Sequence, residues 1–404
     1  MRLHNFAGAL FISIKGEYNN EMRRKTIYLD YAATTPVDKK VLDAMLPFLK
    51  GKFGNPSSLH AFGQEAKVAV EKARESVAEF LKCSPLEVLF TSGATEANNL
   101  ALKGVLLQQK ERPHVITSAI EHESVLDVIK ELENEGAVEA SFIAPNKEGL
   151  VSVEDVRRAI KSNTKLISLM YANSEVGSVQ PIAEMGKIAG KANVLFHTDA
   201  VQAANYLECS VKMLHADLLT LSSHKIYGPK GVGVLYVKEG TPLSAILRGG
   251  GQEQDMRSGT ENVAGIVGMG EAVAELSNPK HQVRHVALRQ LRDRLAKELG
   301  KVPGVSVTGT MGNRLPNNVH VVIEGVEGRD MVQLLDRKGI AVSTGSACSE
   351  RSQSPSHVLL AMGYSEKEAL SALRMTLGKE TSKDDIATTV KAFKVAVEQL
   401  RQAQ

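Results

Sequence analysis

The chain has 404 residues, enough for two packed domains and a substantial core. Its net charge of +3, its lack of tryptophan and its 43% hydrophobic content disfavour a nucleic-acid groove or a membrane-surface protein. Three widely spaced cysteines without a C-x-x-C pair argue against a disulfide scaffold and a zinc site, and favour a reducing, cytoplasmic compartment.

Residues 1–24 are expected to form a disordered extension. The apolar run at 6–14 is much shorter than the roughly 20 residues needed to cross a bilayer, and no small-residue cleavage site follows it. A secretory signal is therefore disfavoured. An upstream start codon, with Met22 as the first residue of the working protein, remains open as an alternative.

From Thr26 onward, short apolar runs alternate with helical patterns. The runs lie at 88–90, 114–116, 141–143, 166–171 and 194–196, and the helices between them cover about 97–108, 124–134, 153–160 and 182–189. This alternation predicts an α/β protein with a mainly parallel sheet between helices. Ser152 and Asp155 resemble a capping box at the start of the third helix.

The pattern changes after about residue 277. Helical patterns at 283–299 and 329–338 alternate with strand-like runs at 305–307, 319–323 and 340–342, and Ser382 with Asp385 caps a final helix that runs to about Gln402. We expect a large domain over residues 25–276 and a smaller α+β domain over 277–404. The first residues of the large domain are left free to pack on the small one.

Lys225 lies two residues after the strand-like region 217–223 and precedes the Gly/Pro-rich turn 228–231. A lysine at the tip of a buried strand is poorly placed for solvent. Burial disfavours its ammonium form and leaves a nucleophilic amine. An isolated lysine of this kind usually extends its amine into solvent instead. The functional interpretation of Lys225 therefore depends on the residues that accompany it.

Asp199 ends the apolar segment 194–199, 26 residues before Lys225, on what we expect is a neighbouring strand. Ligands bind at the carboxyl ends of strands in open α/β sheets. A carboxylate beside a pyridine nitrogen keeps that nitrogen protonated, and a protonated ring is a better electron sink for a carbanion. Lys225 and Asp199 together predict a pyridoxal 5′-phosphate site, although a lone aspartate at this position is usually a capping residue.

The cofactor phosphate needs an anion site, and the strand-to-helix turn 91–95 offers one. This turn has a glycine, hydroxyl groups and free N–H groups at a helix start. A simple helix cap is the alternative. His122 follows another strand and could stack on a flat ring, although a lone histidine of this kind is more often structural.

Cys348 lies among small and polar residues, which predicts an exposed loop and not a core position. An incidental surface thiol is the alternative. Arg374 lies within an otherwise apolar strand-like run, where it needs a carboxylate partner from a protein side chain or a bound substrate. Together, a cofactor, a thiol and a carboxylate-binding arginine predict an amino-acid enzyme with a cysteine nucleophile.

Segments 28–36, 91–98, 121–122, 171–177, 197–202, 222–231, 257–262 and 346–348 carry a close resemblance to a known family. From about Tyr28 to its C-terminus, the chain resembles group I cysteine desulfurases of the NifS/IscS type, which are class V aminotransferase-like, fold-type-I pyridoxal-phosphate enzymes. The resemblance implies an aspartate-aminotransferase-like fold. It also implies conversion of L-cysteine to L-alanine, with a persulfide left on Cys348 and passed to an acceptor such as an iron–sulfur scaffold or a tRNA-thiolation protein.

The resemblance also implies roles for individual residues. Lys225 would bind the cofactor and move a proton at the substrate α-carbon, and His122 would stack on the ring and assist proton transfer. The other implied contacts are Asp199 with the ring nitrogen, Asn173 and Gln202 near the phenolic oxygen, Ala94, Thr95, Ser222, Ser223 and His224 with the phosphate, Thr260 with the phosphate of a partner subunit in a homodimer, and Arg374 and Asn173 with the substrate. No intrinsic metal is implied, although Cys348 could contact a cluster on a partner scaffold.

Three other classes compete with this interpretation. A selenocysteine lyase or an ordinary aminotransferase would keep the cofactor and change the reaction. A non-catalytic partner protein would keep only the scaffold. A nicotinamide dehydrogenase is disfavoured, because no G-x-G-x-x-G follows the first strand.

Overall fold

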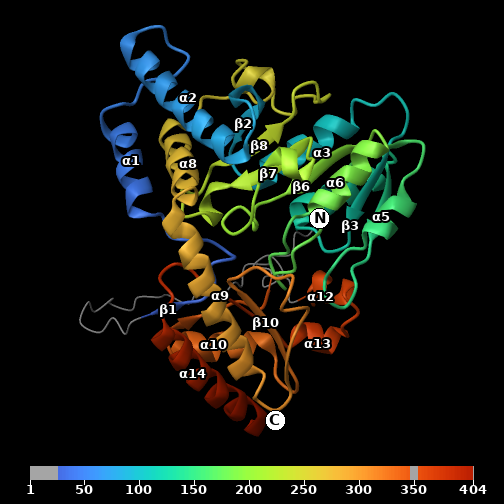
Figure 1. The fold of residues 1–404 in the computed structure, drawn as a ribbon, viewed down its shortest axis with the longest axis vertical. Coiled ribbons are helices and arrows are strands. Elements are labelled where there is room, and N and C mark those ends of the chain that lie inside the picture. Colours follow the sequence, from blue (N-terminus) through green and yellow to red (C-terminus); the bar gives the residue numbers. More distant parts are fainter. Residues whose placement is uncertain (1–25, 346–353, 404) are drawn as a thin grey trace, which may run out of the picture.

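The computed structural model describes residues 26–345 and 354–403, so the predicted extension and Cys348 lie outside the described residues. Figure 1 shows a larger part, which contains a seven-stranded sheet, and a smaller part built around a three-stranded sheet. No helix of the described ranges combines the length and apolarity needed to span a bilayer.

The large sheet is mainly parallel, as predicted from the sequence. Its strand order is β2-β8-β7-β6-β5-β3-β4, and only β8 runs against its neighbours β2 and β7. The strands are β2 (Val88–Thr91), β3 (His114–Ser118), β4 (Glu139–Ile143), β5 (Thr164–Ser168), β6 (Leu195–Asp199), β7 (Leu218–Ser222) and β8 (Gly233–Val237).

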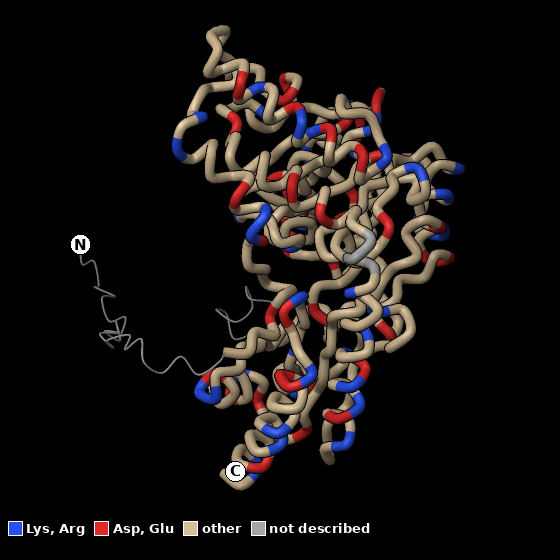
Figure 2. The backbone as a smooth tube through the Cα atoms, turned by 60° about the vertical axis from the view of Figure 1, so that its left-hand side comes forward, with Lys and Arg blue, Asp and Glu red and all other residues tan. Residues whose placement is uncertain are grey.

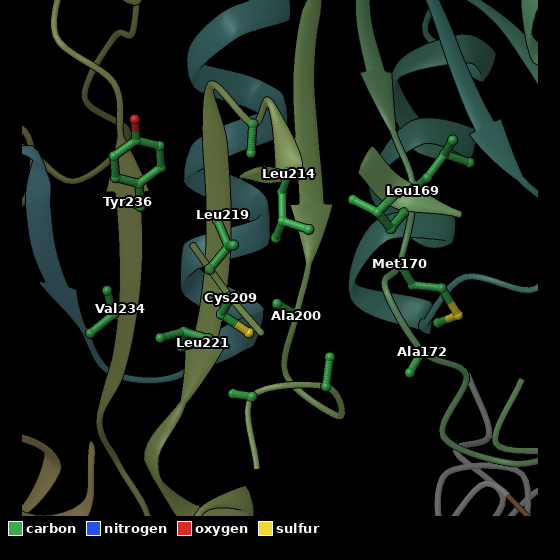
Figure 3. Close-up of a cluster of buried hydrophobic side chains, with 14 of the residues drawn as sticks. Leu169, Met170, Ala172, Ala200, Cys209, Leu214, Leu219, Leu221, Val234 and Tyr236 are labelled. Carbon is green, nitrogen blue, oxygen red and sulfur yellow. The ribbon is translucent and has the colours of Figure 1, made fainter. Parts of the chain in front are cut away.

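Helices cover both faces of this sheet, because successive residues of each strand point to opposite sides. Val115 belongs to the apolar cluster that includes α3 and α4, whereas Ile116, on the opposite face, belongs to the cluster that includes α2, α6 and α8. Part of the second layer, including Leu219 and Leu221 of β7, is shown in Figure 3. The helices are α1 (Lys39–Lys50), α2 (Ala61–Leu81), α3 (Ala94–Leu106), α4 (Glu123–Asn134), α5 (Val153–Ala159), α6 (Ile182–Lys191), α7 (Val211–Leu214) and α8 (Val263–Leu276).

Most predicted elements of this part are confirmed, and the structure adds α1, α2, α8 and β8. Ser152 accepts the N–H of Asp155 at 3.2 Å, which is half of the predicted capping box. Strand β8 goes beyond the predicted pattern because it pairs antiparallel to β7, and only a short 3₁₀ turn and a Gly/Pro-containing loop lie between them.

The smaller part has a separate apolar core. Its sheet joins β9 (Val305–Val307), β10 (Asn318–Ile323) and β12 (Ala372–Thr376) antiparallel, while β1 (Ile27–Tyr28) pairs parallel with β11 (Ile340–Ala341). Ile27 therefore packs in this core although it stands near the start of the chain. The helices are α9 (Pro279–Leu299), α10 (Gly328–Arg337), α12 (His357–Ala361), α13 (Glu366–Leu370) and α14 (Lys383–Gln402).

The predicted capping box of Ser382 and Asp385 is present at the start of α14. Helix α9 begins earlier than predicted, at Pro279, since proline is well suited to a first helical position. Figure 2 shows acidic and basic residues interspersed along both parts, in keeping with the nearly neutral net charge.

Candidate functional site

A cavity of about 640 Å³ lies at the carboxyl ends of the parallel strands. This is the edge at which open α/β sheets bind ligands, and the volume suits a small organic ligand. The predicted residues that line it are Ala94, Thr95, His122, Asn173, Asp199, Gln202, Ser222, His224, Lys225 and Arg374. These residues come from six separate segments of the chain, which therefore converge on one space.

Lys225 reaches the cavity from a short 3₁₀ turn, Ser223–Lys225, directly after β7. Its Nζ donates to the carbonyl oxygens of Ala32 at 2.5 Å and Ala33 at 2.8 Å. Gln202 donates to the same Ala32 oxygen at 3.0 Å. The amine is thus half-buried and oriented by backbone oxygens, in place of extending freely into solvent.

Asp199 ends β6, and β6 pairs parallel with β7, so the predicted neighbouring strands are confirmed. Its two carboxylate oxygens are both held. Oδ1 accepts the Val201 N–H at 3.0 Å, and Oδ2 accepts from Asn98 Nδ2 at 2.8 Å. Asn98 has no role in the sequence-based prediction. It lies one turn into α3 and is fully buried, and its place in the segment 91–98, which carries the family resemblance, was the signal available in the sequence.

His122 is linked to this carboxylate through the Asn98 amide and the Ser124 hydroxyl. Asn98 Nδ2 also contacts Ser124 Oγ at 2.8 Å, and Ser124 Oγ lies 2.9 Å from His122 Nδ1. The Ser124 N–H donates to the same Nδ1 at 3.1 Å. Because Nδ1 accepts, the proton of a neutral His122 ring lies on Nε2.

The start of α3 forms an uncapped anion site at one end of the cavity. The cap residue Gly93 has φ +156° and provides no side-chain hydrogen bond, so the first N–H groups of the helix lack intrahelical acceptors. His224 also lines the cavity, and its Nδ1 lies 3.1 Å from Thr34 Oγ1. Burial, followed by the charges of Lys225 and Lys230, lowers the pKa of His224 to about 4. A bound anion would relieve this positive field.

Arg374 enters from β12 of the smaller part, and its side chain is only 4% exposed. Nη2 donates to Asp30 Oδ1 at 2.8 Å, and Nη1 donates to the Ser174 oxygen at 3.1 Å. Of the two partners that the sequence left open, the structure therefore shows a protein carboxylate. Nε is buried without a hydrogen-bond partner among the described residues. Binding of a substrate carboxylate by Arg374 stays a prediction.

Asn173 donates to the Ile120 oxygen at 3.0 Å, and its Oδ1 accepts the N–H groups of Glu175 and Val176, both at 2.9 Å. Two predicted cofactor residues do not line the cavity. The hydroxyl of Ser223 lies against Gly228, where a Cβ would come within 2.0 Å of it. Thr260 is exposed to solvent.

Two carboxyl groups at the cavity were not predicted from the sequence. Burial raises the pKa of Glu121 to about 8, although its Oε1 accepts from Ser118 and from the Met170 N–H. Burial also raises the pKa of Glu175, which accepts from Ser356. Both belong to segments that carry the family resemblance (121–122 and 171–177), but glutamates are mostly exposed, so their type alone gave no signal of burial.

Residues 27–388 match the family model for aminotransferase class-V. The chain belongs to this family. It is 45% identical over 380 residues to a cysteine desulfurase IscS of Dictyoglomus turgidum, covering 94% of this chain and 96% of the relative. A NifS-like protein structure has a TM-score of 0.87 and 36% identity, covering 93% of this chain and 100% of that one. SspA in complex with cysteine has a TM-score of 0.78 and 38% identity, covering 88% and 100%.

The family uses pyridoxal 5′-phosphate, and the residues present fit this cofactor. The uncapped start of α3 and the cationic surroundings of His224 suit a phosphate group. Asp199 is held at the tip of the strand next to the one that carries Lys225, which suits a ring with a basic nitrogen and an aldehyde. The fit of these residues to the cofactor is argued from contacts within a single chain.

Proposed function

We propose that this protein is a cysteine desulfurase that converts L-cysteine to L-alanine and keeps the sulfur as a persulfide on Cys348. The observation that carries the proposal is the convergence of Lys225, Asp199 and the uncapped start of α3 on one cavity. The kinship with curated IscS enzymes supports it over a selenocysteine lyase or an ordinary aminotransferase.

When bound, pyridoxal 5′-phosphate supplies an electron sink for bonds at the substrate α- and β-carbons. The residues proposed to hold it are Ala94, Thr95, Asn173, Gln202, Ser222, His224 and Asp199, with Thr260 contributed to a second subunit. Ala94 would act through its backbone N–H group. The structure leaves neither group of the predicted Ser223 facing the cavity, since its hydroxyl lies against Gly228 and its N–H donates to the Val232 carbonyl oxygen at 3.1 Å. In this arrangement Lys225 takes a proton from the α-carbon, and Nε2 of His122 is placed to assist proton transfer.

The Cys348 thiolate attacks the sulfur of the bound cysteine. An S–S bond forms and the Cβ–S bond breaks, and its electron pair stays with Cβ. Cβ then takes up a proton equivalent to the one lost by the thiol, so L-cysteine and a thiol become L-alanine and a persulfide. No external oxidant or reductant is needed. Arg374, paired with Asp30, is proposed to orient the substrate carboxylate.

The other two cysteines are poorly suited to this attack. Burial raises the pKa of Cys83 to about 12 and that of Cys209 to about 12. The thiolate is the nucleophilic form, and both thiols stay protonated at neutral pH. Both are free thiols, which supports a cytoplasmic, reducing location as part of the proposal.

The test is a single turnover of the holoenzyme with sulfur-labelled L-cysteine, followed by peptide mapping. We expect label on Cys348 and a stoichiometric amount of alanine, and no label after Cys348→Ala. Label on Cys83 or Cys209 would contradict the mechanism. A Cys348→Ala enzyme that still releases selenide from selenocysteine would favour the lyase, and a colourless protein that cannot be reconstituted would favour a non-catalytic role.

We further propose a homodimer that passes its sulfur to an acceptor protein such as an iron–sulfur scaffold. The hairpin of α1 and α2 exposes Phe53, Leu59 and Phe62 by 74%, 94% and 55%, and the rings of Phe53 and Phe62 stack at 5.7 Å. A second copy would cover this patch, and it would give the exposed Thr260 a phosphate to contact. Leu59→Glu is expected to yield monomers in sedimentation, while a dimeric Leu59→Glu protein would refute this interface.

The division into a large domain over 25–276 and a small domain over 277–404 is likewise proposed. Two main apolar clusters, one in each part, support it. Each cluster also takes residues from the other range: Ile27 and Leu29 pack in the small core, whereas Val358 and Leu359 of α12 belong to the cluster of the large part.

A further inference from the structure

The turn 173–177 joins the cavity to the smaller part of the molecule. Asn173, at the cavity, accepts the backbone N–H of Glu175 at 2.9 Å. From the other side, Asn318 Nδ2 of β10 donates to the Glu175 carbonyl oxygen at 2.8 Å, and Ser178 forms a β-bridge with Arg314. The position of Glu175 is therefore fixed relative to both parts.

The side chain of Glu175 lies close to described residues on both sides of the segment that contains Cys348. Its Oε2 accepts from Ser356 Oγ at 2.5 Å, on the C-terminal side of residues 346–353. On the N-terminal side, a Cβ added to Gly345 would lie 2.8 Å from the same oxygen, at φ +146°. One carboxyl group thus lies beside Gly345, the last described residue before residues 346–353, and accepts a hydrogen bond from Ser356, three residues after them.

Burying the carboxyl group of Glu175 destabilises the folded protein. The residue is 2% exposed, and burial raises the pKa of its carboxyl, opposed by the Ser356 hydrogen bond and by the charges of His357 and Arg374, while Glu123 adds to the rise. A buried carboxyl costs free energy that an apolar side chain of similar size would not. The proposed chemistry assigns no proton transfer to Glu175. Its contacts are therefore the remaining explanation for a buried carboxyl group at this position.

We propose that Glu175 is a positioning residue that anchors both ends of the Cys348 segment to the turn carrying Asn173, and so sets the approach of the thiol to the substrate sulfur. This inference rests on the proposed function. It separates two steps of the reaction. Amino-acid binding at the cavity needs Lys225, Asp199 and Arg374, whereas sulfur transfer also needs the ends of the segment to be held.

The experiment compares holoenzymes with Glu175→Ala, Ser356→Ala and Glu175→Gln. Binding of L-alanine, followed by the cofactor absorbance, reports the cavity, and single-turnover transfer of labelled sulfur to Cys348 reports the approach of the thiol. We expect Glu175→Ala and Ser356→Ala to slow sulfur transfer by up to about a hundredfold, the cost of a misplacement near 1 Å, with L-alanine binding unchanged. Glu175→Gln keeps an oxygen acceptor for Ser356 and restores most of the rate.

Glu184→Ala and Ser162→Ala, at exposed positions on α6 and before β5, serve as matched controls. Equal losses of L-alanine binding and sulfur transfer would show a merely structural role and overturn the inference, as would unchanged transfer in both Glu175→Ala and Ser356→Ala. If Glu175→Ala does not fold, Ser356→Ala and Glu175→Gln still decide. A wild-type enzyme that puts no label on Cys348 would refute the proposed function itself, which distinguishes the two failures.

Discussion

The two parts of the molecule hold their functional charges in different ways. Asp199 of the large sheet is held by Asn98 and Val201, which belong to the same part. Arg374 of the small sheet is held by Asp30 and by the Ser174 carbonyl, which come from other regions of the chain. The cofactor side of the cavity is thus built within one sheet, whereas the proposed substrate side depends on how the two parts meet.

The largest expected effect is at the cofactor side, from Lys225→Ala. Removing the amine removes both the attachment to the cofactor and the proposed proton transfer, and we expect a loss of about 10⁴-fold in desulfurase activity. Borohydride should no longer fix the cofactor to the protein. Lys238→Ala, at an exposed lysine paired with Asp217, is the control. Activity of Lys225→Ala close to that of Lys238→Ala would contradict the assignment.

A smaller effect is expected from the groups that hold the proposed ring nitrogen. Asp199→Asn removes a charge that shifts a neighbouring pKa by about two units, so we expect a loss of about a hundredfold and a changed cofactor absorbance with pH. Asn98→Ala removes one hydrogen bond to that carboxylate, worth about 1.5 kcal/mol, and should cost about tenfold. The measurement is kcat together with a spectrophotometric pH titration. Equal effects of both substitutions would mean that Asn98 does more than orient Asp199.

At the junction between the parts, Asp30→Asn should lower the free energy of unfolding more than it weakens cofactor binding. The Arg374 side chain is 4% exposed and that of Asp30 is 20% exposed. Removing one partner of such a pair leaves the other charge buried, at a cost of about 3 kcal/mol in the free energy of unfolding. Urea unfolding measures this loss. Lys301→Ala, which breaks an exposed pair with Glu298, is the control and should leave the urea midpoint unchanged. An unchanged midpoint for Asp30→Asn would show that Arg374 does not depend on Asp30.

The same contrast explains what the sequence could predict. Lys225 and Asp199 were predictable because each ends an apolar run, and strand ends of a parallel sheet meet at one edge. The pairing of Arg374 with Asp30 joins residues 344 positions apart, and no local pattern signals such a contact. The sequence therefore predicted the types of the secondary-structure elements, but not which residue would pair with a buried charge.

Two neighbouring serines of one motif lie in different surroundings, which their residue type does not indicate. Ser222 lines the cavity, whereas the hydroxyl of Ser223 lies against Gly228. Adjacent residues at a strand end point to opposite sides, and both serines carry the same chemistry, so only the register of β7 decides. Glu175 was missed for a related reason, because its value lies in contacts with Gly345 and Ser356, far along the chain.

The smallest expected effect compares one buried histidine in each part. His197 of β6 contacts Ser168 at 2.8 Å and Thr220 at 3.1 Å, and burial lowers its pKa to about 4. His320 of β10 contacts Thr308 at 2.9 Å, its Nε2 has no partner among the described residues, and burial lowers its pKa to about 3. Both rings are therefore neutral in the folded protein at pH values where an unfolded histidine, with a pKa of about 6.5, takes up a proton.

Each histidine should thus cost stability as the pH falls below about 6.5, since the unfolded state then binds more protons than the folded state. For His320 the loss reaches about 2 kcal/mol at pH 5. We expect His320→Leu and His197→Leu to flatten the fall in the free energy of unfolding between pH 7 and pH 5, measured by urea titration. At pH 7 His197→Leu should cost more, because it leaves two hydroxyl groups without their ring partner and His320→Leu leaves one. A His320→Leu protein with the wild-type pH dependence would show that the ring is not kept neutral by burial in the small core.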